Sequence, residues 1–241
     1  NECYWKTRWE DNYRTMVCYK EGTMGEFNCG GKCDPEPGMW TGLWRDGCTP
    51  PYGTTDGCRP ENTLSGQISW QYEKGYVHVG AAYRDMALWR NTSIAQLSPG
   101  QEVILCYGSL GDEWDPYQPD YADYYPSHRI VLSSTHVGEQ EHNVSLYRHS
   151  SGALVFAVGS MQWSWGLDSI HDNGNNPPSR DMQQATVNIF ADMGVAPGTL
   201  QSNLTDGTLS TDVTAPSSLI TSPAHLANIP ANQLMITGTA S

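Results

Sequence analysis

One stretch, Ser151–Asp168, constrains the fold of this chain more than any other. It contains an apolar run, Ala153–Val158, whose length suits a β-strand that is buried on both faces. Gly159-Ser160 interrupts the run, and Arg180–Met193 then places apolar residues at helical spacing, with Gly194 where such a helix would end. These features predict the last strand and the last helix of an α/β domain, with any chemistry just past the carboxyl end of the strand.

A single strand and helix cannot bury both faces of that strand, so we expect its partner strands to come from elsewhere. Residues 14–150 contain several short stretches typical of strands and turns, and they predict a β-rich insert. Charged residues are only 16% of the 241 residues, while glycine (24) and proline (15) are frequent. This composition also favours strands and turns over long surface helices.

The net charge of −13 narrows the range of partners. No basic patch is visible, so nucleic acid is not expected as a partner. No transmembrane run and no signal peptide is visible either, so no membrane span is expected. The acidity favours solubility, or loops that hold Ca²⁺.

Six of the seven cysteines fall within the first 58 residues, in a segment rich in glycine and proline. Such crowding favours disulfides and an oxidising, extracellular compartment, although zinc binding is the alternative. The odd cysteine is either free, as at Cys18 or Cys106, or paired outside this chain. The cysteines assigned to disulfides are Cys3, Cys29, Cys33, Cys48 and Cys58.

Three Asn-X-Ser/Thr triplets are candidate glycosylation sites, provided that the source organism glycosylates its secreted proteins. They begin at Asn91, Asn143 and Asn203. Asn143 lies in an apparent strand, so its side chain could point inward.

The last part of the chain, Thr205–Ser241, changes character: it is rich in threonine, serine, alanine and proline and has no aromatic residue. Two stretches within it, 215–224 and 233–238, are typical of the first two strands of an immunoglobulin-like sandwich. We therefore expect residues 205–241 to be a linker and the start of such a domain, or a segment that adds to another subunit's sheet. A simple linker is the alternative.

The chain contains several long phrases, many of them rich in tryptophan: NECYWKTRWE (1–10), YRTMVCYK (13–20), WTGLWRD (40–46), RPENTLSG (59–66), LWRNTSIAQLSPG (88–100), LSSTHV (132–137), HNVSLYRHSSGALVFAVGSMQWSWGLD (142–168), MQQATVNIFADMGVAPGTLQ (182–201) and TDVTAPSSLITSP (211–223). Together these phrases resemble the C-terminal domain of the N,N-dimethylformamidase large-subunit family, and most closely its secreted bacterial relatives with immunoglobulin-like modules. They follow the family's order over nearly the whole chain.

This resemblance implies a fold similar to class I glutamine amidotransferases, a flavodoxin-like α/β sandwich, of which residues 1–204 would form the C-terminal part. It also implies a catalytic iron held by two tyrosines and a glutamate, with those ligands in a portion of the same protein before Asn1. Two active-site positions carry over: Asn1 matches an asparagine after a core strand, and Glu113 matches a glutamate that can act as acid or base. Asp112 departs from the family, which has tyrosine there.

Four further side chains near the predicted strand are candidates for lining the site: Trp163, Trp165, His142 and His171. The two tryptophans would point to opposite faces if the strand continued, although burial against loops is the common alternative. Structural roles are likewise the alternative for the two histidines. Asp168 and Asp172 are weak candidates for Ca²⁺ ligands, and turn-making is the alternative for both.

Two hypotheses about function follow. The first is an extracellular, iron-dependent amidohydrolase that acts on a small C–N bond, and it is favoured by Glu113 and Asn1. The second is a structural module of an extracellular surface or filamentous assembly that uses the enzyme fold as a scaffold. The cysteines, the glycosylation triplets and the unpartnered strands favour this second hypothesis, in which the chain self-assembles or packs against neighbouring immunoglobulin-like modules.

Overall fold

The computed structural model describes residues 4–5, 16–17, 44–45, 58–68, 71–111, 113–172, 176–209, 218–224, 227–228, 230 and 235–240. The chain divides into two compact units, residues 1–208 and residues 209–241. The strands are β1 (Tyr4–Trp5), β2 (Met16–Val17), β3 (His78–Gly80), β4 (Glu102–Ile104), β5 (Ile130–Val131), β6 (Thr135–Val137), β7 (Gln140–His142), β8 (Ser145–Arg148), β9 (Leu154–Ala157), β10 (Ser218–Ser222) and β11 (Thr237–Ala240). The α-helices are α1 (Asn62–Ser65) and α2 (Arg180–Asp192), and the 3-10 helices are η1 (Ala81–Tyr83), η2 (Ala87–Trp89), η3 (Ile94–Gln96), η4 (Pro119–Tyr124) and η5 (Trp163–Gly166).

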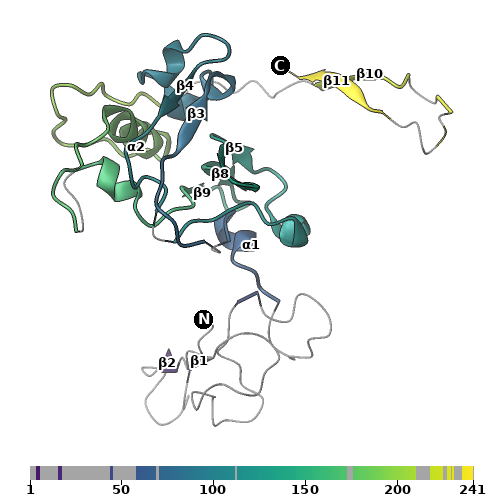
Figure 1. The fold of residues 1–241 in the computed structure, drawn as a ribbon, viewed down its shortest axis with the longest axis horizontal. Coiled ribbons are helices and arrows are strands. Elements are labelled where there is room, and N and C mark those ends of the chain that lie inside the picture. Colours follow the sequence, from purple (N-terminus) through teal and green to yellow (C-terminus); the bar gives the residue numbers. More distant parts are fainter. Residues whose placement is uncertain are drawn as a thin grey trace. The chain divides into compact units, whose positions relative to one another are not determined.

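The first unit is β-rich, as the sequence predicts, but its sheets are small (Figure 1). Every strand pair among the described residues of this unit is antiparallel: β1–β2, β3–β4, β6–β7 and the three-stranded sheet β5–β8–β9. The parallel sheet of a flavodoxin-like fold is therefore not among the residues that the structure describes.

The strand predicted at Ala153–Val158 is present as β9, but its surroundings differ from the prediction. It pairs antiparallel with β8, from Ser145 opposite Ala157 to Arg148 opposite Leu154, and its side chains are half-buried. The reason is the short turn between β8 and β9, since a hairpin makes neighbouring strands antiparallel. Among the described residues β9 has no second partner strand, so it forms an edge of its sheet.

Helix α2 confirms the predicted helix almost residue for residue. Ser179 caps its start by accepting a hydrogen bond from Met182 N, and Gly194 follows its end with a φ of +80°. Met182, Ala185 and Ile189 are buried in the core of the first unit. That core also contains Val77, Val79, Leu88, Trp89, Ile94, Leu105, Leu110, Trp114, Leu132, Val144 and Trp163.

Polar contacts fix α2 against η2. The buried Asn188 amide donates to Leu88 O at 2.8 Å and to Arg90 O at 2.7 Å. Arg90 in turn donates to both carboxylate oxygens of Asp192, at 2.9 and 3.0 Å. A bidentate arginine–carboxylate pair of this kind is geometrically specific, so it holds the end of α2 in one position.

The second unit is a β-hairpin in which β10 and β11 pair antiparallel, with Leu219 opposite Thr239. β10 falls within the first of the two stretches expected to begin an immunoglobulin-like domain, and β11 overlaps only the end of the second, so that identity stays a prediction. None of the helices in the described part of the chain is long and apolar enough to cross a membrane.

Candidate functional site

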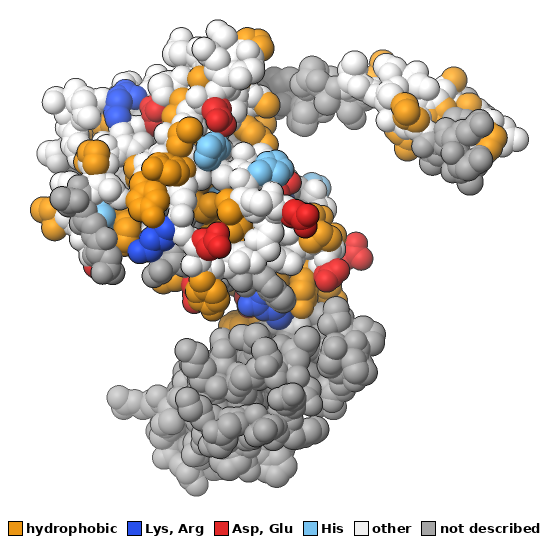
Figure 2. Space-filling model, viewed as in Figure 1, with side chains coloured by type: hydrophobic (Ala, Val, Ile, Leu, Met, Phe, Trp, Pro, Cys, Tyr) orange, Lys and Arg blue, Asp and Glu red, His pale blue; other side chains and the backbone are white. Residues whose placement is uncertain are grey.

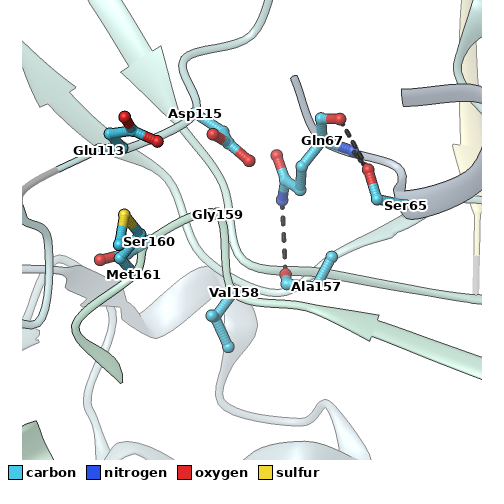
Figure 3. Close-up of a pocket in the computed structure, with 9 residues that line it drawn as sticks. All are labelled: Ser65, Gln67, Glu113, Asp115, Ala157, Val158, Gly159, Ser160 and Met161. Carbon is cyan, nitrogen blue, oxygen red and sulfur yellow. Dashed lines mark hydrogen bonds between the residues drawn. The ribbon is translucent and has the colours of Figure 1, made fainter. Parts of the chain in front are cut away.

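A pocket of about 320 Å³ opens on the first unit where three separate segments of the chain meet (Figure 3). One segment follows α1, one is the segment 113–115, and one is the turn after β9. The lining residues are Ser65, Gln67, Glu113, Asp115, Ala157, Val158, Gly159, Ser160 and Met161. The pocket thus lies past the carboxyl end of β9, where the sequence predicts the chemistry, although the sheet is antiparallel.

Backbone pairing holds the segment 113–115 in an extended conformation. Gln71 and Trp114 exchange two backbone hydrogen bonds, of 3.1 and 2.9 Å. Alternate side chains of an extended segment point to opposite sides. Trp114 is 1% exposed and packs into the core, so Glu113 and Asp115 both project from the other side, into the pocket.

The turn after β9 pairs with the same segment and completes the pocket. Asp115 N donates to Gly159 O at 2.9 Å, and Met161 N donates to Glu113 O at 3.2 Å. Gly159 has a φ of +60°, and a Cβ atom there would lie 2.8 Å from His142 Nε2. Both the backbone conformation and the close approach require glycine at this position.

Gln67 is a buried part of the pocket wall, only 4% exposed. Its side-chain nitrogen donates to Asn143 O at 2.6 Å, to Ser145 Oγ at 3.1 Å and to Ala157 O at 3.4 Å. Because backbone carbonyls only accept hydrogen bonds, the amide nitrogen must face them. The Gln67 oxygen is thereby turned toward Asp115 (Figure 3).

His142 lies behind the pocket and is fully buried. Its Nε2 lies 2.9 Å from Val158 O, so this nitrogen carries a proton and donates to the carbonyl. Burial lowers the pKa of His142 from 6.5 to about 4, against the opposing effect of the hydrogen bonds to the 158–159 backbone. Nδ1 has no hydrogen-bond partner among the described residues. His142 therefore supports the floor of the pocket as a neutral imidazole and does not line it.

The family model of the N,N-dimethylformamidase beta subunit-like C-terminal domain matches residues 1–177. This chain belongs to that family. No curated protein and no solved structure matches the chain. Every residue that lines the pocket lies within the matched range. Helix α2 begins after the end of that range.

The dimethylformamidase resemblance implies an iron whose two tyrosines and glutamate lie before Asn1, so the residues of this pocket do not test that ligand set and iron binding stays a prediction. Its lining has one glutamate and one aspartate, and it includes no tyrosine, histidine or cysteine. Elsewhere in the described part of the chain, no three His, Cys, Asp or Glu side chains gather where they could hold a metal ion. Glu113 is thus placed in a cavity whose own lining residues do not form a metal-binding group.

The two tryptophans predicted to line the site do not reach this pocket. Trp163 and Trp165 lie on η5, not on a continued strand, and both are buried. The Trp163 ring nitrogen donates to Thr186 Oγ1 at 3.2 Å in the core. Trp165 stacks on His171 with 4.5 Å between ring centroids, and Lys74 Nζ lies 5.0 Å from the Trp165 ring. Both indoles are buried because the 3-10 turn directs them inward.

Asp168 makes a turn: its Oδ1 accepts a hydrogen bond of 2.7 Å from Ile170 N. This is the alternative to calcium binding that the sequence leaves open for Asp168. Asp172 is exposed, and neither residue belongs to a metal-binding group among the described residues. Calcium binding by either stays an untested expectation.

Cys58 carries a free thiol, so the disulfide expected there is not formed in the structure. Its Sγ lies 3.1 Å from the hydroxyl of Tyr124, a contact that occupies the thiol. Cys106 is also free, which is one of the two places expected for the odd cysteine, and burial raises the pKa of its thiol. Asn1, Cys3, Cys29, Cys33, Cys48 and Asp112 lie outside the described residues.

Asn143 is not a glycosylation site in this fold, because its side chain is 4% exposed. Its nitrogen donates to Ser133 O at 3.1 Å and to Glu141 Oε1 at 3.0 Å, so it points inward as the sequence allows. Glu141 also accepts a hydrogen bond from Ser134 Oγ. The bond from Ser134, and to a smaller extent the bond from Asn143, lowers the pKa of Glu141. Asn91 and Asn203 are exposed and remain candidates.

Sequence reasoning missed the other half of the pocket. Asp115, Gln67 and Ser65 were not expected at the site, and they come together only through the tertiary fold. For Asp115 a signal exists: Glu113-Trp114-Asp115 alternates charged and aromatic residues, as an extended segment with one buried side does. No comparable local pattern marks Gln67.

Proposed function

We propose that this chain forms part of an amidohydrolase domain, in which Glu113 acts as a general acid–base at a small C–N bond. The observation that carries the proposal is the common direction of Glu113 and Asp115. Both project from one hydrogen-bonded segment into a cavity whose lining also includes Ala157, Val158 and Met161. The family relationship supports the same reaction class.

Hydrolysis of an amide needs a group that takes a proton from water and a group that protonates the leaving amine. Glu113 is exposed at the pocket, so a water molecule and a substrate can both reach its carboxylate. Asp115 is more buried and is held by the backbone bond to Gly159 O. In this arrangement Glu113 transfers the proton, and Asp115 orients the nitrogen end of the substrate.

The experiment uses the whole protein that carries this chain and measures amine release from N,N-dimethylformamide and related small amides. Glu113→Gln keeps the size of the side chain and removes the carboxylate, so kcat is expected to fall by about 10²–10⁴-fold. Glu139→Gln is the matched control, because Glu139 is exposed on the turn between β6 and β7. Turnover that is unchanged in Glu113→Gln, or a whole protein that hydrolyses no small amide, would overturn the proposal.

A second function, a structural module in an extracellular assembly, is favoured by the second unit. Leu219 and Ile220 are 65% and 63% exposed, although they are adjacent residues of β10 and so lie on opposite faces of the hairpin. Figure 2 shows apolar side chains on the surface of this unit. A two-stranded hairpin with apolar residues on both faces is stable only when other strands cover it.

The test compares the assembly mass of the whole protein with that of Leu219→Ser and Ile220→Ser by light scattering. Val195→Ser is the control, since Val195 is 55% exposed in the first unit. Assembly that fails only in the β10 variants supports the structural role. An unchanged mass in all three variants contradicts it.

A further inference from the structure

His142 contacts both of the segments that carry the pocket, although it does not line the pocket itself. The first of these is the segment 113–116. Pro116 forms an antiparallel bridge with His142, so this segment runs beside the end of β7. The His142 ring packs edge-to-face on Trp114, with 6.1 Å between ring centroids and 75° between the ring planes. Because Trp114 is the buried residue of this segment, His142 supports the side that faces away from the pocket.

The second of these segments is the turn after β9. His142 Nε2 donates to Val158 O at 2.9 Å. The next residue of the turn is bonded to the first segment, since Gly159 O accepts a hydrogen bond of 2.9 Å from Asp115 N. The imidazole therefore fixes the turn one residue before the point at which the turn pairs with the segment that carries the carboxylates.

A histidine at this place is unfavourable unless its hydrogen bond is needed. The residue is 0% exposed, and Nδ1 has no hydrogen-bond partner among the described residues. A buried polar atom without a partner costs about 1–3 kcal/mol, so packing alone favours an apolar side chain. The N–H group on Nε2 is what an apolar side chain could not supply to Val158 O. Because the imidazole is closed off from solvent, it cannot itself exchange a proton with a substrate.

We propose that His142 is a positioning residue for Glu113. Its bond to Val158 O holds the turn 158–161 in the place where Met161 N donates to Glu113 O at 3.2 Å. This inference deepens the proposed function and rests on it for its catalytic consequence. Proton transfer needs the Glu113 carboxylate within hydrogen-bond reach of the reacting atoms, and a misplacement of about 1 Å can cost about 10²-fold in rate.

The catalytic test compares His142→Gln with His142→Leu in the whole protein. Glutamine keeps an N–H donor for Val158 O, so kcat for small amides is expected to stay within about threefold of the wild type. Leucine has no donor, so kcat per folded molecule is expected to fall by about 10²-fold with little change in KM. His128→Leu is the matched control, since His128 is exposed between η4 and β5, and its kcat should be unchanged. A purely structural histidine would change the folded fraction and leave kcat per folded molecule unaltered.

Hydrogen exchange in the same proteins tests the positioning without any turnover. In His142→Leu the amide protons of Asp115 and Met161 are expected to exchange at least about tenfold faster, because their bonds join the turn to the carboxylate segment. The amide proton of Leu105 is bonded to Val77 O at 2.9 Å, outside the pocket lining, and should exchange at the wild-type rate. If the leucine variant does not fold, His142→Asn replaces it, because its amide is one methylene shorter than that of glutamine and does not reach Val158 O.

Four results would each overturn the inference. They are a wild-type kcat in folded His142→Leu, an equal loss of kcat in the leucine and glutamine variants, unchanged exchange at Asp115 and Met161, and exchange that is accelerated equally at Leu105. Faster exchange at Asp115 and Met161 alone, in a protein that hydrolyses no small amide, would uphold the positioning and refute the proposed function. Hydrolysis that requires Glu113 but is indifferent to His142→Leu would do the reverse.

Discussion

The buried imidazole of His142 makes the stability of the first unit depend on pH in a direction that the structure fixes. The pKa of His142 is about 4 in the folded chain, below the ordinary value of 6.5. Between these two values the unfolded chain binds a proton that the folded chain does not. The unfolding free energy therefore decreases as the pH falls from 6.5 toward 4. Above pH 6.5 the imidazole is largely neutral in both states, so His142 causes no loss of stability there.

The magnitude follows from the size of the shift. A shift from 6.5 to about 4 corresponds to about 3 kcal/mol in full. Between about pH 7 and about pH 5, where the unfolded histidine is largely protonated and the folded one is not, the expected loss is about 2 kcal/mol. Glu141 does not account for this loss, because its pKa is lowered from 4.5 and its stabilisation is lost at more acidic pH.

The assay compares urea unfolding of the wild type and of His142→Gln at both pH values. Glutamine keeps a donor for Val158 O but has no proton to gain, so its stability should fall by about 2 kcal/mol less than that of the wild type. Other titrating groups are the same in both proteins and cancel in the difference. An NMR titration of the wild-type His142 ring checks the pKa directly if the variant does not fold. Equal losses in the two proteins, or a ring that titrates near 6.5, would refute this reasoning.

Four further outcomes are expected. Gly159→Ala should lower the unfolding free energy by about 2–4 kcal/mol, because it combines a left-handed backbone with a Cβ 2.8 Å from His142 Nε2. Gly138→Ala, at a φ of +60° with open space around it, should cost only about 1 kcal/mol in the same urea experiment. Arg90→Lys should cost about 1–2 kcal/mol by thermal unfolding through loss of the bidentate bond to Asp192, and no such loss would contradict its anchoring role. Expression in a glycosylating host should give no glycan at Asn143 by peptide mass spectrometry, and a glycan found there would show that this side chain is not buried in the folded protein.

The sequence predicts α2 and the existence of β9 well because the signals for both are local. The apolar spacing along Arg180–Met193 and the glycine at position 194 lie in one continuous segment, and they agree. The partner of β9 is not encoded in the apolar run itself. A run of apolar residues fits a buried parallel strand and a half-buried edge strand equally, and here the short turn from β8 decides between them. For the same reason the predicted continuation through Trp163 fails, since the chain turns into η5.

The residues of the candidate site also differ in whether a local sequence signal marks them. Glu113 is found from the family phrase, and Asp115 could be found from the alternation around Trp114, because both are properties of one segment. Gln67 could not be found, because its role depends on Asn143 O and Ala157 O, which lie far along the chain. The missing information is the pairing of distant segments, which a single sequence expresses only weakly.

The geometry of Gln67 explains why this distant pairing matters for chemistry as well as for packing. A glutamine side chain is ambiguous by itself, since its two ends differ only in whether they donate or accept. The Gln67 nitrogen donates to two backbone carbonyls, Asn143 O after β7 and Ala157 O at the end of β9. These two bonds fix which end of the amide is the nitrogen. The sheet that holds β8 beside β9 therefore also fixes the oxygen opposite Asp115, and with it the polarity of the pocket. A change in the register of β9 by one residue would reverse which side chains face the cavity, so the specificity of this site depends on the strand pairing as much as on its carboxylates.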